Sequence, residues 1–277
     1  MRTDSKKLAT KSALSYFGSD SEVAAELAAK LNGCRHVTIP FAGGLSILPH
    51  LTVRGIVAND LNHHAINFYR VVKGLHGQAA QTELFDRCAM TLSHPDEIRL
   101  AVGMLDHFHE STTKPYSEAF HAWAYWVKCW IPRKGKGGTK GKVTMPSIRR
   151  DATGGNNASR LVSVAADLDT WAQHFKRCEF ESVCFRDLLP KVKDSATCGI
   201  YCDAPWVGAG DNYLHSFRLE DHAELAEQLA RFRKAAVVIR YGDAPLIRDL
   251  YRGWRISNRD ARNQSNGRTA ELWITKA

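Results

Sequence analysis

The chain has 277 residues, of which 44% are hydrophobic and 24% charged, and this balance excludes both a disordered chain and a small disulfide-held secreted scaffold. No apolar run approaches the roughly 18 residues of a membrane span, and the first residues lack a signal peptide, so we expect a cytoplasmic protein without a membrane partner. The formal net charge of +9 favours a polyanionic partner.

The first quarter of the chain alternates between helical and extended patterns. Residues 19–31 begin with Ser and Asp and continue with Ala and Leu, which predicts a helix. Residues 35–40 are β-branched and lead into a pair of glycines, the pattern of a strand that ends in a tight turn. A second strand at 53–58 and a helix at 62–73 follow. This alternation predicts an α/β fold.

The middle of the chain, residues 75–176, has a different character. It is predicted to be helical, and the near-helical spacing of its aromatic cluster at 120–130 favours core packing. The glycine-lysine run at 133–142 has no apolar residue and predicts a mobile loop. Residues 119–150 contain no acid, and their basic side chains account for almost all of the net charge, which predicts contacts with nucleic-acid phosphates. These are Lys128, Arg133, Lys134, Lys136, Lys140, Lys142, Arg149 and Arg150.

The α/β pattern returns in the last hundred residues. Apolar extended segments predict strands, and the spacing of Leu225, Leu229 and Phe232 predicts an amphipathic helix. We therefore expect one α/β core that is interrupted by an insertion, not two consecutive domains. The strands are expected at 181–187, 198–203, 235–241, 254–257 and 271–275, and the helices at 219–234 and 245–251.

Three short segments carry groups that suit a nucleotide and an amine. Glycines after the first strand either form an ordinary turn or let the backbone approach a ligand. Asp60 ends the second strand, where an acid either accepts hydrogen bonds from ribose hydroxyls or caps the next helix. Asp203 and the Ala204 carbonyl, with Pro205 favouring an extended Ala204, can hold both hydrogens of an amino group. Trp206 can then stack on the ring that carries this group.

These segments resemble motifs of the Dam-like DNA adenine-N6 methyltransferases, in the same order along the chain. Asp203-Ala-Pro-Trp206 resembles the Asp-Pro-Pro-Tyr signature, and Pro40-Phe-Ala-Gly-Gly44 resembles the S-adenosylmethionine (AdoMet) loop. Asn59-Asp-Leu-Asn62 is similar to the Asp-x-Asn segment of that family. Segments 180–187, 238–243 and 271–275 resemble further strands of the family.

The resemblance implies a Rossmann-like, AdoMet-dependent methyltransferase core. Residues 1–74 and 177–277 would form this core, and residues 75–176 would be a mostly helical target-recognition insertion. Double-stranded DNA would be the partner of a monomer or weak dimer, in the setting of a prokaryotic or phage restriction-modification system.

The resemblance also implies a role for each matching residue. Asp203 and the Ala204 carbonyl would accept hydrogen bonds from the target amino group, while Trp206, after Pro205, would stack on a flipped adenine. Methyl transfer to nitrogen would be direct, so no catalytic cysteine is needed. The residues expected to bind AdoMet are Tyr16, Phe41, Gly43, Gly44, Asp60, Phe185, Asp187 and Asp203.

Two departures from the family pattern keep other functions open. Tyr16-Phe-Gly-Ser-Asp20 has an acid where the family has lysine, and Ala204 replaces a proline. An RNA adenine methyltransferase is one alternative, since an Asp-Pro-Pro-Trp motif occurs in RNA-modifying relatives. A catalytically silent nucleic-acid-binding protein that keeps the fold is another.

Base-specific readout has a separate candidate segment. Residues 147–157 offer side chains for base-edge contacts.

The cysteines do not predict a metal site. His174, Cys178 and Cys184 are close in sequence, as are Cys198 and Cys202, but they lie in predicted strands and a helix and not in zinc-knuckle patterns. We therefore expect reduced, mostly buried thiols and no metal.

Overall fold

The computed structural model describes residues 8–16, 23–110, 116–132, 137–140, 143, 156–208, 213–262 and 268–276. Their contacts group the chain into two compact units. The helical unit comprises residues 1–21, 43–46 and 63–176, and the sheet unit comprises residues 22–42, 47–62 and 177–277. This grouping differs from the predicted division mainly at 1–21 and 63–74, which join the helical unit. The division into catalytic core and recognition insertion stays a prediction.

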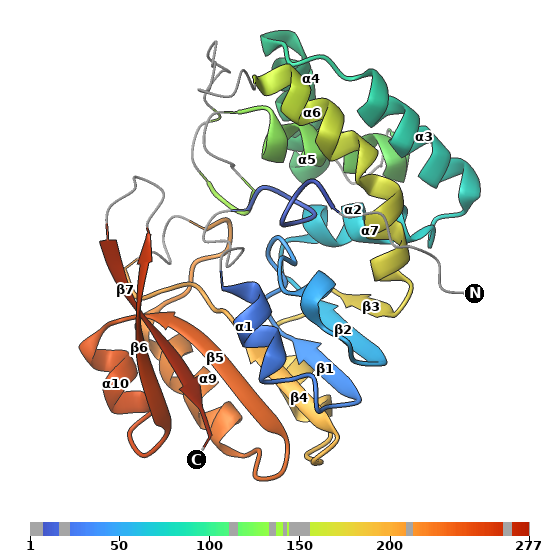
Figure 1. Ribbon diagram of the computed structural model, residues 1–277. Coiled ribbons are helices and arrows are strands. Elements are labelled where there is room, and N and C mark those ends of the chain that lie inside the picture. Colours follow the sequence, from blue (N-terminus) through green and yellow to red (C-terminus); the bar gives the residue numbers. More distant parts are fainter. Residues whose placement is uncertain are drawn as a thin grey trace. The chain divides into compact units, whose positions relative to one another are not determined.

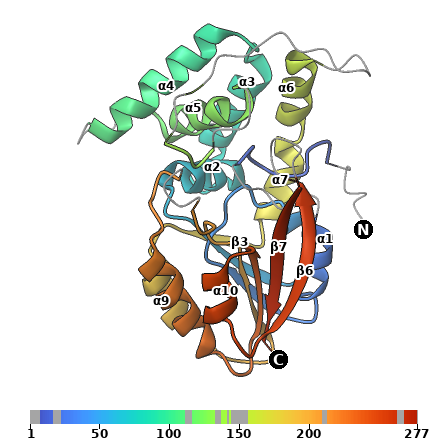
Figure 2. The same ribbon diagram turned by 90° about the vertical axis from the view of Figure 1, so that its left-hand side faces the viewer.

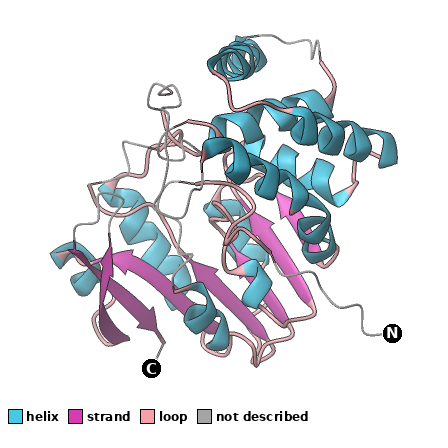
Figure 3. Cartoon of the chain, turned by 45° about the horizontal axis from the view of Figure 1, so that its top comes forward, coloured by secondary structure: helices cyan, strands magenta, loops and turns pink. Residues whose placement is uncertain are grey.

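The sheet unit is built on a seven-stranded sheet with the order β3-β2-β1-β4-β5-β7-β6 (Figures 1 and 3). Strands β3, β2, β1, β4 and β5 are parallel neighbours, and β7 runs antiparallel to β5 and β6. The Rossmann-like α/β class is thereby confirmed. The strands are β1 (His36–Ile39), β2 (Gly55–Asn59), β3 (Cys178–Glu181), β4 (Cys198–Cys202), β5 (Ala236–Gly242), β6 (Arg255–Arg262) and β7 (Arg268–Thr275).

Helices cover both faces of this sheet (Figure 2). On one face, Leu225 and Leu229 of α9 pack with Ile274 of β7 in a buried apolar cluster. Full burial of each such side chain contributes about 1.5–3 kcal/mol. Trp273 points the other way, toward α1, where Lys30 lies over its ring. The helices are α1 (Ala24–Ala29), α8 (Phe185–Leu188), α9 (Leu219–Ala230) and α10 (Pro245–Leu250), with 3₁₀ turns η1 (Leu48–His50) and η2 (Leu189–Lys191).

The helical unit is arranged around α5, which packs against α2, α3 and α4 (Figure 1). The Ser117 hydroxyl caps this helix by accepting from the Phe120 amide at 3.1 Å. Trp126 at the centre of α5 is fully buried, so the expected core role of the aromatic cluster is confirmed. The unit's helices are α2 (His63–Lys73), α3 (Gln78–Met90), α4 (Pro95–Glu110), α5 (Glu118–Trp130), α6 (Asn157–Ala166) and α7 (Leu168–Phe175).

Two local predictions were wrong. The segment 181–187 is not a strand throughout: β3 ends at Glu181, and α8 begins at Phe185 with Pro190 directly beyond it in η2. The run 133–142 is not an open loop throughout, because Gly137, Gly138 and Thr139 are buried. The absence of glycine side chains explains this burial, since it lets the chain approach other groups closely.

The remaining strand and helix predictions are confirmed to within a few residues, although β6 and β7 are longer than expected. All seven cysteines are free thiols, and Cys88, Cys129, Cys178 and Cys202 are buried. Among the residues that the structure describes, no helix is both long and apolar enough to span a bilayer.

Candidate functional site

The sequence-predicted residues of the sheet unit gather at one edge of the sheet. Phe41 follows β1, Asp60 follows β2 and Asp203 follows β4. Strand β1 pairs in parallel with both β2 and β4, so the carboxyl ends of all three strands point to the same edge. After β1 the next strands in sequence, β2 and β3, lie on one side of it, and β4 and β5 lie on the other side. The edge between β1 and β4 is therefore the topological switch point. Doubly wound sheets bind ligands outside their strands at this point.

Asn59, the last residue of β2, holds this edge together. Its fully buried side chain donates to the carbonyls of Pro40 and Val183 at 2.9 and 3.0 Å and accepts from the Val183 amide at 3.0 Å. The turns that follow β1 and β3 are thus both fixed to the end of β2. Each bond satisfies a polar group that would be costly to bury alone.

Asp60 is tied into the same edge mainly through its backbone. Its carbonyl accepts from the Ser182 hydroxyl at 3.0 Å, and its carboxylate Oδ1 accepts from the Asn62 amide at 2.9 Å. The second bond orders the turn just before α2, which resembles the capping role considered from the sequence. The carboxylate is held at the end of the strand, where it can accept further hydrogen bonds.

Three phenyl rings contact one another in an apolar wall, and two of them belong to the segments that follow β1 and β3. The Phe41 ring centroid lies 5.8 Å from that of Phe185 and 5.7 Å from that of Phe217. Phe185 is 3% exposed, whereas Asp187, on the same short helix α8, is exposed. The sequence predicted Phe41 and Phe185 but missed Phe217. An apolar wall and a carboxylate that follow strands ending at the same edge suit a purine ring joined to a ribose.

Asp203 belongs to a buried ion-pair network that the sequence did not predict. Arg240 of β5 donates to Asp203 Oδ2 at 3.1 Å and to Glu271 Oε2 at 2.8 and 3.0 Å. Trp273 Nε1 donates to the other Glu271 oxygen at 2.7 Å. Glu271 is fully buried and Arg240 is 6% exposed. Shared between two acids, the guanidinium fixes the direction of the Asp203 carboxylate.

The residues after Asp203 pack into this network. Trp206 is partly buried, and the Arg240 guanidinium lies 5.0 Å from its ring centroid. A Cβ added to Gly242 would lie 2.5 Å from the Trp206 ring, so the glycine permits this close packing. Ala204 is buried at 2% exposure. The roles of Ala204, Pro205 and Trp206 toward a target base stay predictions.

Tyr213 is another residue at this edge that the motifs do not reveal. Its pKa is raised, chiefly because its phenol is buried and secondarily because Asp203 is near. The phenol therefore stays protonated at neutral pH and can serve as a hydrogen-bond donor. The sequence signal was weak, since a single tyrosine outside a recognised motif has no distinctive spacing.

Tyr16, Gly43 and Gly44 lie together in the helical unit. Tyr16 forms a parallel bridge with Gly137, and Tyr69 donates its hydroxyl hydrogen to the Gly43 carbonyl. Gly43 has a φ of +50°, and a Cβ on Gly44 would lie 2.7 Å from the Leu14 carbonyl oxygen. The glycines are therefore required by a close approach of the N-terminal segment. Whether they border a cofactor stays a prediction.

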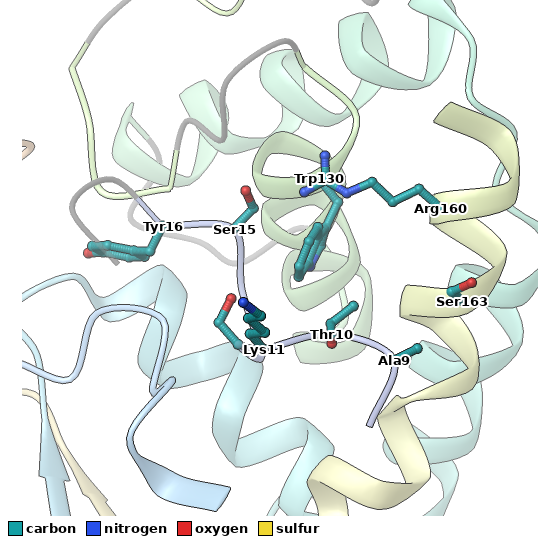
Figure 4. A pocket seen from close by; sticks show the side chains of 9 residues that line it. Ala9, Thr10, Lys11, Ser15, Tyr16, Trp130, Arg160 and Ser163 are labelled. Atoms are coloured by element: carbon teal, nitrogen blue, oxygen red, sulfur yellow. The ribbon is translucent and has the colours of Figure 1, made fainter. Parts of the chain in front are cut away.

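The N-terminal segment also lines a pocket of about 420 Å³ in the helical unit (Figure 4). Arg160 of α6 reaches toward Trp130 of α5, with its guanidinium 5.0 Å from the ring centroid. Lys11 adds a second cationic side chain. Thr10, Ser12, Ser15 and Ser163 contribute hydroxyls to the lining. Such a mixture of cations and hydroxyls suits an anion.

Of the basic residues predicted to contact nucleic acid, two are described: Lys140 has an exposed side chain, and Lys128 is a half-buried residue of α5. The others lie outside the described residues, as do residues 147–155 of the segment considered for base contacts and Asp20 of the departing motif. These other basic residues are Arg133, Lys134, Lys136, Lys142, Arg149 and Arg150.

No family model matches the chain, and no curated protein does. Among solved structures, the chain is similar to a protein of Klebsiella pneumoniae that is provisionally described as an O-methyltransferase. The identity is 8% and the TM-score 0.40, over 95% of this chain and 84% of the other. At this TM-score and identity we infer neither family nor activity from the likeness. The fold assignment rests on the strand order and register.

Proposed function

We propose that the protein is a site-specific DNA adenine-N6 methyltransferase that uses AdoMet. One observation carries this proposal: the motif residues Phe41, Asp60 and Asp203, far apart in sequence, all follow strands that end at the switch-point edge of one sheet. A cofactor and a target amino group must meet at one place for direct transfer. The carboxyl edge of the sheet unit supplies groups suited to both.

The groups on one side of this edge fit AdoMet. The wall of Phe41, Phe185 and Phe217 suits its adenine, and the carboxylate of Asp60 suits the two ribose hydroxyls. When bound, AdoMet supplies an electrophilic methyl group. Tyr16, Gly43, Gly44 and Asp187 are further candidates from the resemblance.

The Asp203 carboxylate is the proposed acceptor for the target amino group, together with the Ala204 carbonyl. Two fixed acceptors draw the nitrogen lone pair out of conjugation with the ring, which raises its nucleophilicity. Arg240 is the positioning residue, since it holds Asp203 Oδ2 at 3.1 Å and is itself anchored by buried Glu271. Fixed dipoles and charges need little reorganisation during the reaction. Trp206, packed against Arg240, is the proposed stacking surface for the base.

The DNA partner is supported by charge in the helical unit. The pocket beside Lys11 and Arg160 offers cations and hydroxyls to a phosphate, and Lys140 is exposed on the basic run. The remaining basic residues of segment 119–150 add to the same charge along the chain. Phosphate contacts of this kind make affinity fall steeply with salt.

Methyl incorporation into matched duplex DNA, single-stranded DNA and RNA tests the activity and its substrate together. We expect AdoMet binding by calorimetry and incorporation into duplex DNA, at adenines that sequencing then identifies. Greater incorporation into RNA would overturn the DNA assignment in favour of an RNA adenine methyltransferase. Nucleic-acid binding without AdoMet binding would overturn the catalytic proposal in favour of a silent binding protein.

A further inference from the structure

Three histidines of the helical unit come together between two helices. His63 and His64 begin α2, and His121 belongs to α5, 57 residues after His64. One ring nitrogen from each lies within 4.8 Å of the others. His64 Nδ1 and His121 Nε2 are 2.6 Å apart, and the His63 and His64 ring centroids are separated by 4.0 Å.

The cluster is buried on one side and open on the other. His64 and His121 are only 2% and 4% exposed, whereas His63 is exposed. Two buried imidazoles can satisfy each other by sharing one hydrogen, and this contact alone would join the helices. A third imidazole beside them, reaching solvent, adds a ligand and an entry path that a simple hydrogen-bonded pair does not require.

We propose that His63, His64 and His121 bind a divalent transition-metal ion of the zinc class. Imidazole nitrogen is the ligand that such ions share, and three protein ligands leave a fourth position for water on the His63 side. Bonds of about 2.0–2.1 Å in a tetrahedral site separate the nitrogens by about 3.3 Å. The His64–His121 pair must therefore open by several tenths of an ångström, which rotation of the two rings can provide.

The protons balance without any loss to solvent. In the hydrogen-bonded pair, one ring donates the shared hydrogen and the other accepts it. When the ion takes the place of that hydrogen, the hydrogen moves to the other nitrogen of the donor ring, so this neutral ring changes tautomer but not charge. For His121 this nitrogen is Nδ1, which lies 3.9 Å from Glu118 Oε2. A carboxylate behind a metal-binding imidazole fixes the ring's orientation and tautomer.

The ion would fasten the first turn of α2 to α5. Helix α5 packs against α2, α3 and α4, so a bound ion would stabilise the arrangement on which the helical unit depends. An ion that binds only the folded chain raises its apparent stability. At concentrations well above Kd, this gain grows with the logarithm of the ratio of the ion's concentration to Kd. This inference does not rest on the proposed methyl transfer.

Cobalt titration of the chelator-treated full chain tests the site. We expect saturable visible absorption bands from Co²⁺ at one ion per chain, with no sulfur-to-metal charge-transfer band, and displacement of Co²⁺ by Zn²⁺. We also expect Zn²⁺ to raise the Tm. A sulfur charge-transfer band would assign the ion to the cysteines, and absence of saturable binding would equally overturn the proposal.

Two variants and one control locate the ligands. His63→Ala changes an exposed side chain, so we expect the metal-free Tm to be unchanged and the Co²⁺ affinity to fall at least 10-fold. His121→Gln keeps a hydrogen-bonding side chain in the buried position and should lose the bands. His76→Ala, an exposed histidine of the same unit outside the cluster, should bind as the parent chain does. Parent-like affinity in His63→Ala would overturn the assignment, even if His121→Gln failed to fold.

Discussion

The two regions that hold the predicted site residues are built on different physical principles. At the carboxyl edge of the sheet unit, buried polar bonds from Asn59 fix the turns after β1 and β3, and those from Arg240 fix the Asp203 side chain. Around Tyr16 in the helical unit, glycines let backbone segments approach closely. The first region should therefore be most sensitive to lost charges or hydrogen bonds. The second should be most sensitive to added volume.

Removal of the Arg240 guanidinium is expected to give the largest effect. Arg240→Met leaves buried Glu271 and partly buried Asp203 without their shared cation. Breaking a buried ion pair from one side costs about 3–5 kcal/mol. We expect urea denaturation to show a loss of this order.

A second substitution separates lost charge balance from lost packing. The double variant Arg240→Met/Glu271→Gln removes the more deeply buried of the two orphaned charges and should recover part of the lost stability. No recovery would mean that the stability of the sheet edge depends on side-chain packing, as that of the glycine-rich region does, and not on charge balance. The proposed contrast between the two regions would then fail.

Asp203→Asn is expected to remove about 100-fold or more of the methyl-transfer rate while leaving the fold intact. The substitution keeps the shape but exchanges a charged acceptor for an amide, and loss of one fixed electrostatic partner typically costs this much. Single-turnover methyl transfer measures the effect. Asp249→Asn, an exposed residue of α10, is the matched control and should retain the rate. Equal rates in the two variants would remove Asp203 from the proposed mechanism.

The sequence predicted the positions of the strands more completely than it predicted the side-chain contacts between them. Periodicity and turn residues are local signals, so β1, β2, β4 and β5 were found nearly in place. The pairing of Arg240 with Asp203 depends on β4 and β5 being neighbours, which no local pattern encodes. Tertiary context also explains the burial of Gly137. The glycine-lysine run has the sequence pattern of a solvated loop, but in the structure Tyr16 forms a bridge with Gly137.

The candidate site was predictable where a motif fixed both residue type and position. Phe41, Asp60 and Asp203 follow strands, and parallel strands bring their ends to one edge. Phe217 and Tyr213 lie outside such motifs. They belong to the segment between β4 and α9, and only the tertiary fold brings them to this edge. The histidine cluster was missed for the same reason, since His121 is remote in sequence from His63 and His64.

Gly44→Ala tests the volume sensitivity of the helical unit. The new methyl group would lie 2.7 Å from the Leu14 carbonyl oxygen, so backbone must shift, at a cost of about 1–3 kcal/mol. Gly103→Ala is the matched control, since nothing lies within 4 Å of its added Cβ and the site is an exposed turn of α4. We expect this control to gain about 0.5–1 kcal/mol from helix propensity. Thermal denaturation of both variants should show opposite shifts, and a loss in both would contradict the steric explanation.

The smallest expected effect is a pH dependence at the sheet unit's aromatic wall. His222 contacts Phe217 and lies 2.9 Å from the Tyr241 hydroxyl through Nδ1. Burial lowers the His222 pKa, although nearby Asp221 opposes the shift. The unfolded chain therefore binds the proton more readily than the folded chain does. The stabilisation is complete above the ordinary histidine pKa of about 6.5 and is lost as pH falls through and below that value.

His222→Gln isolates this contribution from the general effect of acid on the chain. Between pH 7.5 and 5.5, we expect the parent chain to lose more unfolding free energy than the variant, because the variant has no imidazole to protonate. His76→Gln changes an exposed histidine and should keep the parent's full loss. Urea denaturation at the two pH values measures all three chains. If His222→Gln lost as much stability as the parent, protonation of this buried ring would not contribute to the acid sensitivity of the sheet unit.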